Sequence, residues 1–138
     1  MLQLSELLTK NPILAKESES YQLDTSDPSQ ILAQLKETIK KDFPEAPDAN
    51  FTVKYVDEAL EDYLSPAFYL TSPIDDYKEN SIYINEGSHY EKMKLFTTLA
   101  HEGFPGHLYQ NVFANTSGLP SVRQLLNYSG YTEGWATY

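Results

Sequence analysis

The sequence predicts an α+β fold in which helices accompany a small, mostly antiparallel sheet. Apolar residues recur at helical spacing near both ends of the chain, and three short β-rich runs lie between them. At 138 residues the chain has the length of one domain, and no internal repeat divides it. We therefore predict a single α+β region, with helices and a loop over 1–50, strands over 51–86 and further helices over 89–138.

The clearest helix of the first half begins at Asp27-Pro28, because an Asp N-cap followed by proline is a common helix start. Its apolar stripe consists of Ile31, Leu32, Leu35 and Ile39. Pro44 ends this pattern, since proline lacks the amide hydrogen that a helix interior needs. Leucines at helical spacing predict an earlier amphipathic helix over residues 2–8.

Three runs rich in β-branched and aromatic residues predict the strands of the sheet. They cover residues 51–56, 67–71 and 81–85. Residues 57–64, between the first two runs, are compatible with either a short helix or a loop. The spacing of the runs favours antiparallel neighbours.

Helical patterns return from Tyr90 onward. Apolar residues over 93–100 cover more than one helix face, which predicts a buried helix that runs directly into His101-Glu102. Ser88 and Glu91 have the spacing of a capping box at its start. Another helix is predicted to begin at Ser121, and the apolar-rich pattern continues to the end of the sequence.

Composition excludes several classes of function. The 20 acidic and 10 basic residues give a net charge of −10, which argues against a nucleic-acid partner. Without cysteine, the chain has no thiol nucleophile, so any metal site must use histidine and carboxylate ligands. The sequence also lacks an apolar run of the roughly 20 residues that a membrane span requires. Compartment and oligomeric state do not follow from composition.

Two of the three histidines flank the short stretch His101-Glu102-Gly103-Phe104-Pro105-Gly106-His107. On a straight helix, residues six positions apart would point about 120° apart and could not share one metal ion. Pro105 cannot continue a regular helix, however, because its ring would clash with the carbonyl of His101. We therefore predict a kink or bulge that returns His107 to the face of His101.

A catalytic zinc ion commonly takes three protein ligands, and two histidines with one glutamate form one such set. Glu133 is the candidate third ligand because it is the only acidic residue after Glu102. Its neighbours Tyr131, Trp135 and Tyr138 suggest an apolar setting in which an unpaired carboxylate would be costly. Glu102 would then be the general base that activates metal-bound water.

A simpler interpretation remains open for each of these residues. The two histidines would be ordinary surface or core residues, and Glu133 would lie on a helix surface. For Arg123, the only arginine, the sequence favours a surface residue over a group that binds a substrate carboxylate.

The stretch from His101 to Gln110 resembles a signature of the bacterial family known as domain of unknown function 885. That family pairs His-Glu-x-x-Pro-Gly-His-x-x-Gln with a downstream Glu-Gly-Trp-Ala-x-Tyr. The second motif corresponds here to residues 133–138. Agreement at Pro105, Gly106 and Trp135, beyond the charged residues, makes the match specific over residues 98–138.

This family is similar to zincin-like metallopeptidases whose third zinc ligand is glutamate. The resemblance implies His101, His107 and Glu133 as zinc ligands, Glu102 as catalytic base, and a sheet whose edge strand could pair with an extended peptide. Because family members are longer and largely helical, it also implies that this chain is a catalytic-core fragment of a zinc-dependent hydrolase acting on a peptide or other amide. The alternative is a non-enzymatic α+β binding module that retains a peptidase-like fold.

Overall fold

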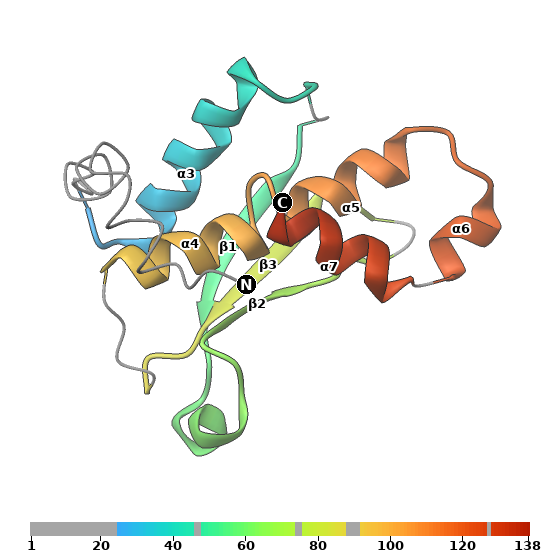
Figure 1. Ribbon diagram of the computed structural model, residues 1–138. Helices are drawn as coiled ribbons and strands as arrows, with labels where there is room; N and C mark the ends of the chain where they lie inside the picture. The colour runs from blue at the N-terminus through green and yellow to red at the C-terminus, as the bar shows by residue number, and fades with distance from the viewer. Residues whose placement is uncertain (1–24, 46–47, 74–75, 88–91, 127) are drawn as a thin grey trace, which may run out of the picture.

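The computed structural model of the chain describes residues 25–45, 48–73, 76–87, 92–126 and 128–138 (Figure 1). The predicted helix over residues 2–8 and the Ser88 cap lie outside these described residues. The elements follow in the order α3 (Pro28–Thr38), η1 (Ile39–Lys41), β1 (Asn50–Tyr55), η2 (Glu58–Tyr63), β2 (Ala67–Leu70), β3 (Glu79–Ile84), α4 (Lys92–Glu102), α5 (His107–Thr116), α6 (Ser121–Leu125) and α7 (Ser129–Thr137).

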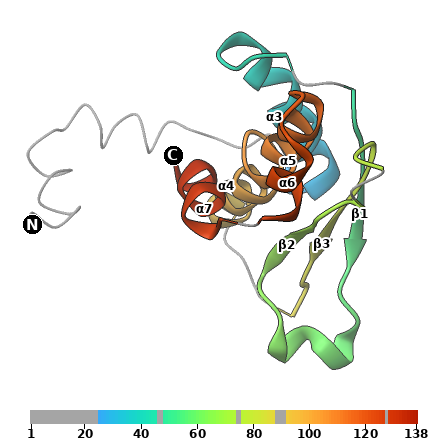
Figure 2. The ribbon, with the colours of Figure 1, turned by 90° about the vertical axis from the view of Figure 1, so that its right-hand side faces the viewer.

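These elements confirm the α+β class. The described helices α3 to α7 lie on one side of a three-stranded sheet (Figure 2). Contacts between α4 and β2 and between α3 and β1 connect the two layers. Among the described residues, no helix combines the length and apolar character needed to cross a membrane.

The sheet is mixed, whereas the sequence predicted a mostly antiparallel one. β3 lies between β1 and β2, pairing antiparallel with β2 but parallel with β1. The spacing of the runs left the pairing order open, and β1 and β2 are the two edges. β3 takes the centre because its inward-facing residues Asn80, Ile82 and Ile84 are all buried under the helices.

The N-terminal part of the core confirms the predicted helix. The Asp27 side chain caps α3 by accepting a hydrogen bond from the amide of Gln30 at 2.9 Å. Ile31 and Leu32 are fully buried in the same cluster as residues from the sheet and from α4 and α5. Burial of this stripe holds α3 against α4 and thereby supports the end of α4, where the histidine motif begins.

Candidate metal centre

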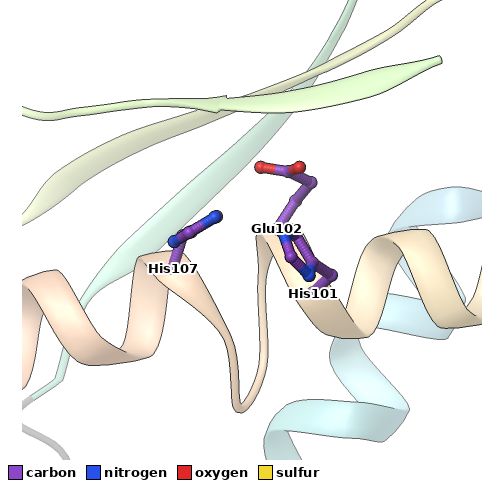
Figure 3. Close-up of side chains that lie close together, drawn as sticks. All are labelled: His101, Glu102 and His107. Atoms are coloured by element: carbon purple, nitrogen blue, oxygen red, sulfur yellow. The ribbon is translucent and has the colours of Figure 1, made fainter. Parts of the chain in front are cut away.

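The histidine motif breaks the helix as predicted. α4 ends at Glu102, residues 103–106 form a tight loop, and α5 begins at His107. Figure 3 shows the chain turning away after Glu102 and returning at His107, so that the side chains of the motif converge. The ring centroids of His101 and His107 are 4.7 Å apart and their planes are perpendicular.

Backbone hydrogen bonds and one glycine determine this loop. The amide of Gly106 donates to the carbonyl of Ala100 at 3.0 Å, and the amide of Tyr109 donates to that of Gly103 at 3.1 Å. A Cβ atom on Gly106 would overlap the backbone carbonyl of His101. The close return of the chain therefore requires glycine at this position.

Phe104 fixes the loop to the hydrophobic core. Its side chain is buried in the core and meets Phe51 of β1 edge-to-face, with ring centroids 5.8 Å apart. Such a pair adds to the stabilisation from burial alone. The sequence motif thus contains Gly106, which permits the tight turn, and Phe104, which attaches the turn to the sheet.

Glu102 points away from the helix axis towards the sheet (Figure 3). Its Oε2 atom accepts a hydrogen bond of 2.9 Å from the backbone amide of Tyr69 in the edge strand β2. One donor atom each from His101, Glu102 and His107 lies within 4.8 Å of the others, so these three residues form a group that could hold a metal ion.

A polar network holds Tyr69 in place. The Tyr69 hydroxyl donates to Oδ1 of Asn80 at 2.7 Å and accepts from Nδ2 of Asn111 at 2.9 Å. Asn111 lies on α5, one turn after His107, and also donates to the Ser72 hydroxyl at 3.1 Å. The network therefore ties the edge strand that holds Glu102 to the helix that carries His107. Sequence reasoning missed these residues, because nothing local marks a tyrosine or asparagine as a partner of a distant strand.

Glu133 reaches the same histidines from α7. One carboxylate oxygen is 3.5 Å from Nε2 of His101, and the other is 3.5 Å from Nε2 of His107. The side chain is 62% exposed, so the buried apolar setting expected for it is wrong. Tyr131 and Tyr138, which suggested that setting, are also exposed.

Trp135 aligns α7 with the motif. Its indole Nε1 donates to the carbonyl of Pro105 at 2.7 Å, and its ring stacks on Tyr109 with centroids 6.2 Å apart. Burial raises the pKa of the Tyr109 hydroxyl above its ordinary value of 10.0, so the group stays a neutral donor to the carbonyl of Pro44. Trp135 lies two residues after Glu133 on α7, so its contacts hold the helix that carries this carboxylate against the motif.

The two distances between Glu133 and the imidazoles are longer than ordinary hydrogen bonds. An N–H···O hydrogen bond usually measures about 2.7–3.2 Å. Two ligands of one tetrahedral zinc ion, each bound at the usual N or O distance, are about 3.4 Å apart. The two 3.5 Å separations around Glu133 match that value. The donor set of two imidazoles and a carboxylate also suits zinc.

Gln110 provides a further polar group beside the motif. Its side chain is buried, and its Nε2 atom has no hydrogen-bond partner among the described residues. Gln110 is one turn from His107 on α5 and contributes to the lining of the same cleft. Buried amides are rarely left unpaired, so this position is typical of a site that is completed by a group other than the described residues.

The motif opens into a cleft of about 1090 Å³. Its walls come from β2, from the C-terminal end of α4, from the length of α5, and from the α6–α7 segment. The volume is slightly above the usual range for small-molecule sites, about 300–1,000 Å³. The four predicted site residues all line this cleft: His101, Glu102, His107 and Glu133.

Comparison with known proteins gives the family. Residues 4–138 match the family described as bacterial protein of unknown function, DUF885. The chain belongs to this family. The comparison with curated proteins finds no match.

The chain of this DUF885 protein is also similar to a solved structure, described as that of a putative lipoprotein from Colwellia psychrerythraea. The two chains are 27% identical, and the TM-score is 0.68. The match covers 80% of this chain and 20% of that one, so this chain spans about a fifth of the length of its structural relative. The fold of most of this chain thus recurs within a much longer protein.

Proposed function

We propose that this DUF885 chain is the zinc-binding core of a zincin-like hydrolase that acts on a peptide or another amide. The observation that carries the proposal is the position of Glu133. Its two oxygens lie 3.5 Å from the Nε2 atoms of His101 and His107, at the spacing of ligands around one zinc ion. No other described carboxylate contacts both imidazoles in this way.

The surroundings of the two glutamates support different roles. Glu133 approaches the histidines from α7 and faces both of them, which suits a ligand. Glu102 is held on the strand side by the Tyr69 amide through Oε2, which leaves Oε1 for another partner. We therefore assign His101, His107 and Glu133 as ligands and Glu102 as general base.

Each residue then has a defined task in hydrolysis. Zinc bound by the three ligands would supply a Lewis acid that lowers the pKa of water towards 7. Glu102 takes the proton that water loses as it attacks the amide carbonyl, and it can later pass that proton to the leaving nitrogen. The Tyr69 amide keeps the Glu102 carboxylate oriented during both transfers. β2 is an edge strand of the sheet and lies beside this carboxylate, so an extended substrate could pair with that edge.

The substitution Glu102→Gln tests the general base. It removes the proton acceptor but preserves the shape of the side chain, so hydrolysis should fall by between about 10²-fold and 10⁴-fold. Zinc affinity should change little, because the ligands remain. Hydrolysis is measured on a mixed peptide library by mass spectrometry, and zinc binding by calorimetry on the same preparations.

The control is Glu58→Gln, in η2, away from the motif. It should retain both zinc binding and hydrolysis. Full turnover in Glu102→Gln would exclude Glu102 as the base. Zinc binding by the unsubstituted protein without cleavage of any library peptide would contradict the hydrolase and favour the binding module.

A further inference from the structure

We infer that the cleft selects substrates that carry a carboxylate, and that Arg123 binds this group. The inference deepens the proposed function, because it treats the cleft as the substrate site. Arg123 is the only arginine in the 138-residue sequence, and it lines the cleft that contains the histidine motif. The described lining of the cleft contains no lysine, so Arg123 is the only permanent cation among these residues.

Arg123 has no counter-ion in the part of the chain that the structure describes. The ion pairs among these residues involve Lys36, Lys40 and the two histidines. The two carboxylates of the cleft have other partners, since Glu133 faces the histidines and Glu102 binds the Tyr69 amide. The guanidinium is therefore available to an anion from outside the chain.

The charge of the whole chain makes this single cation significant. At a net charge of −10, the surface as a whole repels anions, so an anionic ligand needs a local positive group. A planar guanidinium matches a carboxylate through two parallel hydrogen bonds. One cation beside two glutamates suits a monoanion better than a phosphate dianion, which is why we assign a carboxylate.

The side chains around Arg123 indicate which chemical group of the ligand lies beside its carboxylate. Four apolar or aromatic side chains from the α6–α7 side line the cleft and remain exposed: Leu119, Leu126, Tyr128 and Tyr131. Exposed apolar groups gathered in a cleft are typical of a binding surface. We therefore expect an apolar side chain next to the carboxylate, as in a peptide that ends in leucine or phenylalanine.

Binding of two small probes tests the inference without relying on hydrolysis. N-acetyl-leucine carries the carboxylate, and N-acetyl-leucinamide is its neutral counterpart. Both are titrated by NMR into the chain after removal of metal with a chelator, so that the carboxylate cannot bind zinc instead. N-acetyl-leucine should bind about tenfold more tightly than the amide, the usual gain from a charged hydrogen-bonding partner.

Substitutions at Arg123 test whether this residue causes the tighter binding of N-acetyl-leucine. Arg123→Gln should abolish it, and Arg123→Lys should retain part of it. Lys78→Gln, which removes an exposed cation outside the cleft, should leave it unchanged. Equal affinity for the two probes, or a preference that persists in Arg123→Gln, would overturn the inference.

Hydrolysis by the zinc-loaded chain separates this inference from the proposed function. A peptide with a free carboxyl terminus is compared with its amidated form, and with an amidated form that contains glutamate. Faster cleavage of the peptide with a free carboxyl terminus would show that the site binds the C-terminal carboxylate. Faster cleavage of the amidated peptide with glutamate would show that it binds a side-chain carboxylate. Cleavage of all three at one rate contradicts the carboxylate site but keeps the hydrolase. Arg123-dependent probe binding without any cleavage contradicts the hydrolase but keeps the site.

Discussion

Glu102 and Glu133 carry the same functional group beside the same two histidines, yet their surroundings differ. Glu102 is half-buried and fixed by a backbone amide of the sheet, whereas Glu133 is largely exposed and lies opposite both Nε2 atoms. An exposed carboxylate gains little from a simple ion pair in water. Charge pairing alone therefore gives a weak reason for the arrangement of Glu133, and the proposed function assigns it as a metal ligand instead.

At the residue scale, Glu133→Gln should weaken zinc binding strongly. The amide keeps the size of the side chain but loses the anionic donor. We expect the Kd for zinc to rise by more than the roughly ten- to hundredfold that removal of an outer contact costs. Competition with a chromophoric chelator measures this Kd. Zinc affinity equal to that of the unsubstituted chain would remove Glu133 from the ligand set.

Trp135→Phe tests the residue that positions Glu133. Phenylalanine keeps an aromatic ring beside Tyr109 but loses the hydrogen bond from Nε1 to the Pro105 carbonyl. The free energy of unfolding should fall by about 1 kcal/mol. Zinc affinity should fall by about tenfold, as for other groups that orient ligands. A loss of stability with unchanged zinc affinity, measured by denaturant titration and calorimetry, would limit Trp135 to packing.

At the element scale, the break between α4 and α5 creates the site. A spacing of six residues is wrong for a straight helix, and the loop at 103–106 corrects it. Pro105 allowed the break to be predicted, because its effect on a helix is local. The burial of Phe104 against Phe51, and the approach of the Tyr69 amide to Glu102, could not be predicted because they depend on strand pairing.

Gly106→Ala tests the break itself. The added methyl group would overlap the His101 carbonyl, so the free energy of unfolding should fall by about 2 to 3 kcal/mol and zinc affinity should fall with it. Gly134→Ala on α7 is the matched control, since nothing lies within 4 Å of its Cβ position. That change should leave stability unaltered or raise it by up to about 1 kcal/mol. Similar thermal unfolding of both variants would argue against a tightly returning loop.

In the sheet, the positions of the strands could be predicted from the sequence, but their order could not. All three strands were predicted from their β-rich runs, with only small shifts at their ends. Strand order was not, because β3 inserts between two strands that precede it in sequence. Local propensity identifies strands but carries no information on which of them meet.

At the scale of the whole molecule, the excess of acidic residues and the lack of cysteine restrict the chemistry that the chain can perform. Without cysteine, histidine and carboxylate are the available types of metal ligand. The fold brings such residues together from α4, α5 and α7. The chain spans about a fifth of the length of its structural relative. The proposed substrate contacts are those made by the cleft of this region.

The metal content of the purified chain tests the central claim most directly. Protein prepared without chelator and analysed by inductively coupled plasma mass spectrometry should contain one zinc ion per chain. His101→Ala and His107→Ala should each reduce zinc to trace levels, while circular dichroism confirms that both variants remain folded. Absence of zinc from the unsubstituted chain after incubation with zinc salt, or full zinc content in both folded variants, would contradict the account.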